Sequence, residues 1–284
     1  LEYVWLDGYE TKNLRSKTKV VNRSDIKINE AKKEIEIESI PYWNFDGSST
    51  KQAEGNASEC VLKPVRLYTE QNIIYVFCEV LNSDLSPHET NTRSLLRKNR
   101  KNDFWWGFEQ EYFIINENGN PVGFPDEGYP HPQGEYYCGV GSKNVKYRKF
   151  ATLHMHLCLG LGIEITGINA EVAPGQWEYQ CFAKDTLKAC DDLWMSRYIL
   201  HKLSEEFNVS IDISPKPVEG DWNGSGCHTN FSNSIMRQDN DKDYYFDILN
   251  SMSNNHLDHI GVYGVNNELR LTGHHETQHI EKFS

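Results

Sequence analysis

The chain has 284 residues with 41 acidic and 29 basic side chains, which gives a formal net charge of −12. Its 38% hydrophobic content is typical of globular proteins, and its length suffices for about two domains. The acidic balance and the lack of a dense Lys or Arg run exclude a nucleic-acid partner, because binding phosphates requires clustered positive charge. No apolar stretch approaches the roughly 20 residues of a membrane helix, so we expect no membrane partner.

The cysteines and the first residues indicate the cellular setting. Seven cysteines are spread along the chain, and no two have the C-x-x-C spacing of a structural zinc or redox site. The chain begins with the strand-like pattern Leu1 to Asp7, without an initiator Met or a signal peptide. We therefore expect a cytoplasmic protein in a reducing environment, of which this chain is a fragment.

The first 84 residues predict a small, mostly β domain. Short runs of β-branched and aromatic residues alternate with turn-forming residues. The predicted strands cover residues 3–6, 17–21, 35–37, 61–67 and 73–80. Ser83 and Pro87 then offer a cap and a proline at the start of a helix, followed by a polar stretch to about Lys101. We place the domain boundary between residues 84 and 85.

The remaining residues predict an α+β domain. Apolar residues recur at helical spacing over residues 150–161, 187–198 and 245–252. The strands between these helices alternate polar and apolar residues, which favours an antiparallel sheet with one face on helices and one face available to ligands. The chain contains no phosphate-binding G-x-x-x-x-G-K-S/T or G-x-G-x-x-G loop, so any nucleotide is held in another way.

Four glutamates lie in strand-like, apolar surroundings. Glu109 and Glu111 are two residues apart and share one face of a predicted strand, while Glu171 and Glu178 flank a Pro-Gly turn. Carboxylates on a solvated edge strand are the alternative for the first pair. Four such carboxylates without nearby cysteines favour a hard cation, Mg²⁺ or Mn²⁺, which usually accompanies phosphate chemistry.

Two further segments carry candidate functional residues. A glycine-bearing loop over residues 221–227 leads into a strand in which His228 and Asn230 share a face. A hydrogen-bonded core histidine is the alternative for His228. Arg270 and Glu276 surround a glycine turn, as expected for a mobile loop that binds an anion, although a surface ion pair has the same signature. The arrangement of the C-terminal histidines disfavours a zinc site, because the neighbours His274 and His275 point in different directions in an extended chain.

Together these motifs resemble the glutamine synthetase family, specifically its shorter eukaryotic-type class. Seven segments carry the resemblance, in the family's order and across essentially the whole chain. They are WNFDGSST at 43–50, WWGFEQEY at 105–112, YYCGVG at 136–141, NAEV at 169–172, QWE at 176–178, NGSGCHTNFS at 223–232 and RLTGHHET at 270–277.

The resemblance implies a β-grasp-like domain over residues 1–84 and a larger catalytic domain over 85–284, with a curved antiparallel sheet flanked by helices. The implied activity is the ATP-dependent ligation of ammonia to L-glutamate through γ-glutamyl phosphate, in nitrogen assimilation. ATP would be the co-substrate, and two or more Mg²⁺ or Mn²⁺ ions would be the cofactors.

The resemblance also implies a role for individual residues. One divalent ion would be held by Glu111, Glu171 and Glu178, and a second by Glu109 and His228. Glutamate would be bound by Trp222, Asn223, Gly224 and Arg270. The nucleotide would be lined by Trp105, Glu109, Glu178, Asn230, Phe231 and Ser232. Ammonium would be bound by Asp46, Ser49 and Tyr137, with Asp46 as the base and Glu276 as the flap that shields the intermediate from water.

In this family Asp46 comes from the neighbouring subunit, so the resemblance implies a homo-oligomer, a decamer of two stacked pentamers with shared active sites. The family continues past Ser284 into a segment with further arginines and a glutamate ligand, and it also has an N-terminal helix. We therefore expect the fragment alone to be inactive. Two local departures are Cys181 to Lys184 in place of a Gly-Pro turn, and Asp221 where the family often has Asn.

Three alternatives remain open on the sequence. A ligase of the same fold could join glutamate to another amine. A non-catalytic member could keep the fold as a structural protein, although it would not need to retain Asp46, the four glutamates and His228 together. A carboxylate-based metal hydrolase also fits the glutamates, but it leaves Asp46 and the loop from Arg270 to Glu276 without roles.

Overall fold

The computed structural model describes residues 1–101, 103–238 and 241–283. The chain divides into two compact units: Leu1–Lys101 with Gly160–Gly162, and the rest of the chain. Both helices and strands are present, which confirms the α+β class. The domain boundary between residues 84 and 85 stays a prediction.

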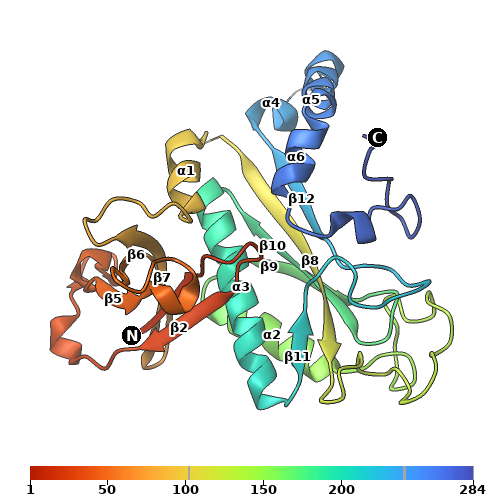
Figure 1. The fold of residues 1–284 in the computed structure, drawn as a ribbon, viewed down its shortest axis with the longest axis horizontal. Coiled ribbons are helices and arrows are strands. Elements are labelled where there is room, and N and C mark those ends of the chain that lie inside the picture. The colour runs from red at the N-terminus through yellow and green to blue at the C-terminus, as the bar shows by residue number, and fades with distance from the viewer. Residues whose placement is uncertain (102, 239–240, 284) are drawn as a thin grey trace. The chain divides into compact units, whose positions relative to one another are not determined.

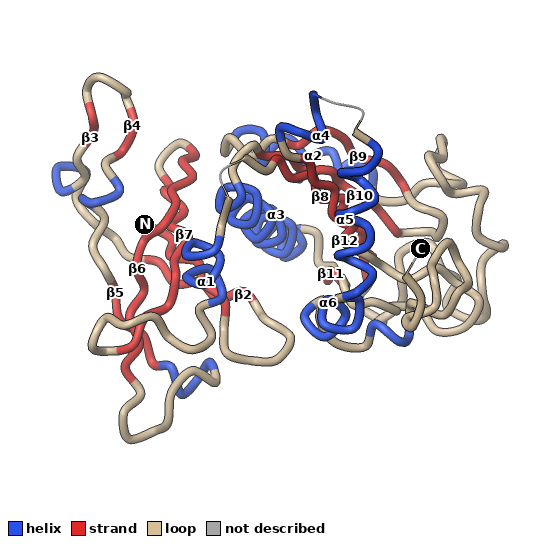
Figure 2. Tube along the Cα trace, turned by 90° about the horizontal axis from the view of Figure 1, so that it is seen from above, coloured by secondary structure: helices blue, strands red, loops and turns tan. Residues whose placement is uncertain are grey.

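The first unit is built on a five-stranded sheet with the order β2-β1-β7-β6-β5 (Figure 1). Its strands are β1 (Glu2–Leu6), β2 (Leu14–Thr18), β5 (Trp43–Asp46), β6 (Glu59–Glu70) and β7 (Ile73–Asn82). β1 pairs with β7 in parallel, and the other pairs are antiparallel. Alternate residues Tyr3 and Trp5 pack with Leu62 and Val76 in the buried core. A short hairpin, β3 (Ile28–Asn29) and β4 (Glu34–Ile35), stands away from this sheet in Figure 2.

Three predictions for this unit were wrong. The strand predicted at 35–37 ends at Ile35, and Ile37–Ser39 forms a 3-10 helix. The strand predicted at 17–21 ends at Thr18, which pairs with Glu2, and Val20 is 93% exposed. The helix predicted to start at Ser83 to Pro87 is instead a turn, because the Asp84 carboxylate accepts a hydrogen bond from Ser86 N at 2.9 Å. The helix α1 (Thr92–Asn99) starts later, where the Asn91 side chain accepts from Ser94 N at 3.0 Å.

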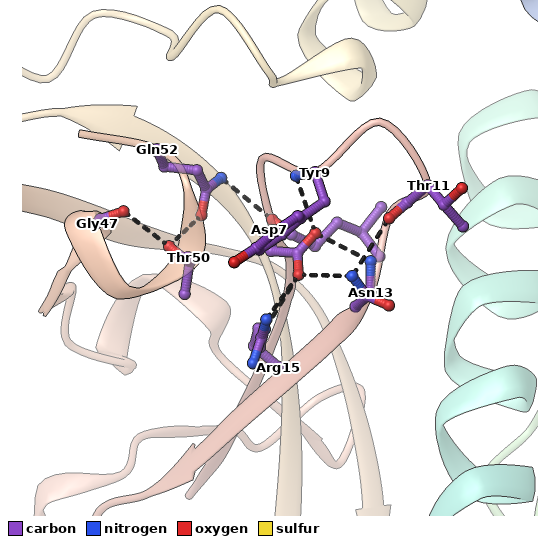
Figure 3. Close-up of polar contacts among 9 residues, drawn as sticks. Asp7, Tyr9, Thr11, Asn13, Arg15, Gly47, Thr50 and Gln52 are labelled. Carbon is purple, nitrogen blue, oxygen red and sulfur yellow. Dashed lines mark hydrogen bonds and ion pairs between the residues drawn. The ribbon is translucent and has the colours of Figure 1, made fainter. Parts of the chain in front are cut away.

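A buried carboxylate fixes the hairpin that follows β1 (Figure 3). Asp7 is fully buried and accepts hydrogen bonds from the backbone N–H groups of Tyr9 and Asn13 and from the Arg15 guanidinium at 3.0 Å. Beside it, the Gln52 side chain donates to the Leu6 carbonyl at 3.2 Å. This contact ties β1 to the segment that directly follows residues 46–50.

The second unit contains an antiparallel sheet with the order β11-β8-β10-β9, in which β12 also pairs with β8. The strands are β8 (Trp105–Ile115), β9 (Ile165–Ala170), β10 (Gln176–Ala183), β11 (Ser210–Asp212) and β12 (Cys227–Ser232). All four pairings are antiparallel, as predicted. The departure at Cys181 simply continues β10, with Cys181 opposite Phe108.

Helices α2 (Arg148–Gly160) and α3 (Thr186–Glu206) pack on this sheet, and Figure 1 shows α3 running along one side of it. They confirm the helices predicted from residues 150 and 187. His154 of α2 is fully buried and lies edge-on to the Tyr179 ring, with 4.9 Å between ring centroids. α5 (Lys242–Asn254) was also predicted, whereas α4 (Ser234–Gln238) and α6 (His256–Val262) were not. Within the described ranges, no helix has the length and apolarity to cross a membrane.

Candidate active site

Strand register places the predicted carboxylates on one face of the second unit's sheet. Glu111 of β8 pairs with Glu178 of β10, and Glu109 of β8 pairs with His228 of β12. Directly paired residues point to the same face of a sheet, as do residues two apart on a strand. The intervening residue Gln110 points to the opposite face, where it accepts from Arg197 Nε of α3 at 2.9 Å. We call the surface that carries Glu109, Glu111, Glu178 and His228 the carboxylate face.

Each carboxylate on this face accepts hydrogen bonds from neutral or weakly basic donors. Glu111 accepts from Gly226 N at 3.0 Å, and Glu109 accepts from Asn230 Nδ2 at 2.7 Å. Glu171, which follows β9, accepts from Asn169 Nδ2 at 2.9 Å and from Val172 N at 3.1 Å. Glu178 accepts from Gln180, and His228 Nδ1 lies 3.4 Å from Glu109 Oε2.

The same carboxylates are hard to ionise in this environment. Burial is the largest cause of the raised pKa of Glu171, which is about 7. The negative charges of Glu111 and Glu178 raise this pKa further. Burial likewise raises the pKa of Glu111, although Arg270 opposes the shift, and it raises the pKa of Glu178. A cation stabilises carboxylates that are desolvated and that repel one another. A ligand set of carboxylate oxygens with one imidazole nitrogen suits Mg²⁺ or Mn²⁺.

The residues on the carboxylate face are not drawn together around a single point. Across residues 1–101, 103–238 and 241–283, no three His, Cys, Asp or Glu side chains form a ready metal cluster. Glu109, Glu171 and Glu178 each accept from a side-chain amide, so their carboxylates have no cationic partner among these contacts. The donor set therefore fits divalent ions, and the assignment of particular ligands stays a prediction.

Arg270 lies against a backbone that only glycine permits. A Cβ atom at Gly226 would lie 2.6 Å from Arg270 Nη2, and one at Gly224 would lie 2.9 Å from Arg270 Cγ and 2.1 Å from the Pro215 carbonyl oxygen. Arg270 Nε is buried and donates to no partner in the described part of the chain. A buried donor without a partner is costly, so this position favours an anionic ligand beside Gly224.

The aromatic residues predicted to bind ligands have different surroundings. The Trp222 indole is buried and packs on Phe124, with 5.0 Å between ring centroids, so its ring belongs to the core. The partly exposed Trp105 ring has Arg237 Cζ at 3.9 Å and Lys184 Nζ at 4.7 Å from its centroid. A basic, aromatic surface of this kind suits a nucleotide.

The predicted nucleotide residues of β12 lie near this surface. Asn230 is exposed and contacts Glu109, as described above. Phe231 packs on Trp106, with 5.8 Å between ring centroids. Ser232 accepts through its carbonyl from Arg237 Nη1 at 2.8 Å. β12 therefore links the carboxylate face to the basic surface around Trp105.

The predicted ammonium-binding residues belong to both units. In the first unit Asp46 is exposed and accepts from the Ser48 hydroxyl at 2.6 Å and from the Ser49 hydroxyl at 3.4 Å. The Ser48 hydrogen bond is the main reason that the pKa of Asp46 lies below its usual value. In the second unit Tyr137 is exposed, and its pKa is raised first by Cys138 and then by Glu171.

Sequence reasoning missed several glutamines that support this site. Gln176 donates to the Gly224 carbonyl at 3.1 Å, and Gln110 donates to the Glu111 carbonyl at 2.7 Å while accepting from Arg197 Nε at 2.9 Å. Gln133, in the long segment before α2, contacts Asn223. Gln110 and Gln176 could have been recognised from the sequence, because each is a polar residue at an inward position of an apolar strand. No sequence pattern marks Gln133, which lies in a loop.

Comparison with known proteins decides the family. The family model described as the glutamine synthetase catalytic domain matches residues 89–262. The chain belongs to the glutamine synthetase family. A glutamine synthetase of Bradyrhizobium diazoefficiens is 47% identical over the whole chain, which covers 82% of that relative. A glutamine synthetase of Yarrowia lipolytica is 44% identical over the whole chain, which covers 77% of it, and a chloroplastic one of Chlamydomonas reinhardtii is 44% identical over 99% of the chain, which covers 77% of it.

A solved structure supports the fold independently. The cryoEM structure of Plasmodium falciparum glutamine synthetase matches with a TM-score of 0.72 at 18% identity. The match covers 97% of this chain and 61% of that protein's chain. At this identity the likeness concerns the fold, and it agrees with the α+β class and the curved antiparallel sheet predicted for this glutamine synthetase family member.

Proposed function

We propose that the full-length, assembled protein catalyses the ATP-dependent ligation of ammonia to L-glutamate, which gives L-glutamine, ADP and phosphate. The observation that carries the proposal is the carboxylate face in a member of this family: Glu109, Glu111, Glu178 and His228 share one side of the sheet. Glu171 couples electrostatically to Glu111 and Glu178 from the end of β9. Phosphoryl transfer requires such a concentration of cation ligands.

Divalent ions are the proposed cofactors, either Mg²⁺ or Mn²⁺, with two or more in each site. Glu111, Glu171 and Glu178 would hold one ion, and Glu109 and His228 a second. When bound, the ions would neutralise charge on the transferring phosphoryl group. The raised pKa values of Glu111, Glu171 and Glu178 support this assignment, since a nearby cation would favour the ionised form of these groups.

The glutamate substrate would bind beside Arg270. Its α-carboxylate would accept hydrogen bonds from the Arg270 guanidinium, whose Nε is buried without a partner in the described residues, while Asn223 and Gly224 would bind the rest of the amino-acid group. The nucleotide would lie along Trp105 and residues 230–232. The γ-carboxylate oxygen of glutamate would then attack the γ-phosphorus of ATP, which forms γ-glutamyl phosphate and releases ADP.

Ammonium would bind at Asp46, assisted by Ser49 and Tyr137. The lowered pKa of Asp46 keeps its carboxylate ionised at neutral pH, as binding a small cation requires. Asp46 would take a proton from ammonium, and the ammonia nitrogen would attack the γ-carbonyl carbon while phosphate leaves with the electron pair of the broken C–O bond. Glu276 would cover the intermediate and exclude water.

We further propose a homo-oligomer, a decamer of two stacked pentamers, in the cytoplasm. Asp46 would act on the site of a neighbouring subunit, so each complete site would be shared between two copies of the chain. Sedimentation of the full-length protein tests the assembly. Mixing inactive Asp46→Ala and Glu171→Gln subunits tests the sharing, because some mixed interfaces would regain activity only if the two residues come from different subunits.

The proposed reaction is tested by incubating full-length, assembled protein with glutamate, ATP, Mg²⁺ and hydroxylamine. We expect γ-glutamyl hydroxamate that depends on ATP, with ammonia giving glutamine in the same conditions. Small primary amines in place of ammonia distinguish a ligase for another amine. No hydroxamate from an assembled oligomer would contradict the proposal and favour a non-catalytic member of the family.

A further inference from the structure

Gln133 lies between two loops that carry proposed substrate and flap residues. Its Oε1 accepts from Asn223 N at 2.9 Å, and its Nε2 donates to Asn223 Oδ1 at 2.8 Å. A carboxamide that donates to and accepts from one asparagine fixes the position of that residue. The same Nε2 lies 3.2 Å from His275 Nδ1. One side chain thus contacts both the loop of Asn223 and the residue next to Glu276.

The donor and acceptor groups available determine which residue donates in each of these contacts. The Gln133 amide can only donate from Nε2, so His275 Nδ1 accepts and the ring proton lies on Nε2. His275 Nε2 is 3.1 Å from Asp221 Oδ1 and donates to it. The ring is therefore held on both sides. Its side chain is 21% exposed, whereas that of Asp221 is 99% exposed, so the contact with Gln133 is the better shielded of the two.

The loop that carries Glu276 depends on such a contact. His275 and Glu276 both have left-handed backbone conformations, with φ of 53° and 61°. Two consecutive side-chain-bearing residues in this region are strained and need surrounding contacts to persist. The Thr277 hydroxyl lies 2.8 Å from the His274 carbonyl and 3.0 Å from the Arg270 carbonyl, and both contacts stay within the segment from Arg270 to Thr277.

Gln133 is itself held near the carboxylate face. Gly134 N donates to the Val172 carbonyl at 3.1 Å, directly after Glu171. The backbone next to Gln133 is therefore held near the end of β9, and the Gln133 side chain contacts the two loops. The negative charge of Glu276 acts on Glu111, so the loop that Gln133 contacts lies close enough to the site to affect it.

We propose that Gln133 is a positioning residue that couples the substrate loop at Asn223 to the flap loop at Glu276 through His275. This inference rests on the proposed function. When Asn223 holds glutamate, Gln133 and His275 would keep Glu276 over the reacting carbonyl, so that γ-glutamyl phosphate reacts with ammonia rather than with water. Loss of Gln133 would loosen both loops together.

The activity test compares Gln133→Leu, His275→Leu and the double variant in full-length, assembled protein. With limiting ammonium, we expect the phosphate released per glutamine formed to rise at least about twofold in each single variant. We also expect kcat/KM for glutamate to fall roughly tenfold, since two or three hydrogen bonds are lost. The double variant would be no worse than Gln133→Leu. His275→Asn, which keeps an acceptor near Nδ1, would restore part of the coupling.

Asp221→Asn is the matched control, because it changes the exposed partner of His275 and leaves Gln133 in place. We expect less than a twofold effect. If Gln133→Leu fails to assemble, Gln133→Met carries the test, since it fills a similar volume and can donate neither to Asn223 Oδ1 nor to His275. An unchanged phosphate-to-glutamine ratio, or independent multiplying effects in the double variant, would overturn the proposal.

Hydrogen exchange separates this inference from the proposed function. In Gln133→Leu we expect the amides of residues 271–280 to exchange about fivefold faster than in the wild type, as one lost hydrogen bond allows. Faster exchange in a protein that makes no glutamine would support the coupling and refute the proposed reaction. Normal glutamine synthesis with unchanged exchange in the variant would refute the coupling alone.

Discussion

Glu79 in the first unit and Glu171 in the candidate site of the second unit have opposite electrostatic surroundings. In the first unit Glu79 of β7 is fully buried and lies 2.6 Å from Arg97 Nη1 and 3.4 Å from Lys63 Nζ. Burial opposes its ionisation, but the Arg97 hydrogen bond and these positive charges outweigh burial and hold its pKa below the usual value. In the second unit, Glu171 accepts hydrogen bonds from the neutral Asn169 side-chain amide and from Val172 N, and burial raises its pKa to about 7.

This contrast separates carboxylates that stabilise the fold from carboxylates that serve a ligand. The first unit supplies its own cations, so Asp7 and Glu79 stabilise the folded chain without any other component. The carboxylate face has one nearby arginine, Arg270, whose charge lowers the pKa of Glu111 without offsetting burial. We infer that burying unpaired carboxylates here lowers the stability of the fold, and that the site is kept because it binds a cation.

The largest expected effect is on catalysis by Glu171→Gln. Loss of a proposed cation ligand should lower the rate of glutamine formation about a thousandfold, since a bound cation contributes several kcal/mol to phosphoryl transfer. Thermal unfolding without metal should show the variant to be at least as stable as the wild type, because a desolvated charge is removed. A metal-free variant that is clearly less stable would contradict the contrast between the units.

Glu79→Gln should have the opposite signature. Removing the charge leaves Arg97 and Lys63 without their common partner, and we expect the free energy of unfolding to fall by about 3 kcal/mol. Denaturant unfolding measures this loss, with Glu70→Gln as a control on an adjacent strand. Metal affinity should remain that of the wild type, and a large decrease in affinity would show that the units are not independent in this respect.

The pH dependence should also differ. The pKa of folded Glu79 lies below its unfolded value of about 4.5, so its stabilisation is present above that pH and is lost as the pH falls through the folded pKa. Glu171 instead must lose a proton to bind a cation. Mn²⁺ affinity should therefore weaken up to about tenfold per pH unit below pH 7 in the wild type. A flat affinity between pH 7 and pH 5.5 would contradict the raised pKa.

Among the effects on stability, the smaller is expected for Asp7→Asn. Asparagine keeps the shape of Asp7 but turns one acceptor into a donor facing Arg15 or Asn13, which should cost about 2 kcal/mol of unfolding free energy. Hydrogen exchange of residues 9–13 would locate the loss in the β1–β2 hairpin (Figure 3). Unchanged exchange there would show that Asp7 does not fix this hairpin.

Much of the fold could be predicted because apolar periodicity reflects burial. β1 and β7 are short runs of β-branched and aromatic residues that are buried at most positions, and α2 and α3 have apolar residues at helical spacing, so their locations followed from the sequence. The helix start near Pro87 was mispredicted because Asp84 can cap a turn as readily as Ser83 can cap a helix. Such short-range choices depend on tertiary contacts, here the bridge between Leu81 and Pro87.

The candidate site, too, could be predicted from the sequence only in part. Glu109 and Glu111 could be assigned to one face from their spacing, and the register of β10 and β12 then adds Glu178 and His228. The contacts of Gln133 with Asn223 and His275 could not be predicted, because they join loops about 90 and 142 residues away in sequence. Periodicity carries no information on side-chain contacts between irregular segments.

The most direct test of the contrast between the units is a calorimetric titration of the full-length protein with Mn²⁺ alone at pH 7.5. We expect the wild type and Glu79→Gln to bind with the same affinity, and Glu171→Gln to bind at least about tenfold more weakly. No Mn²⁺ binding by the assembled wild type, or equal affinity in all three proteins, would contradict the assignment of the carboxylate face as a cation site.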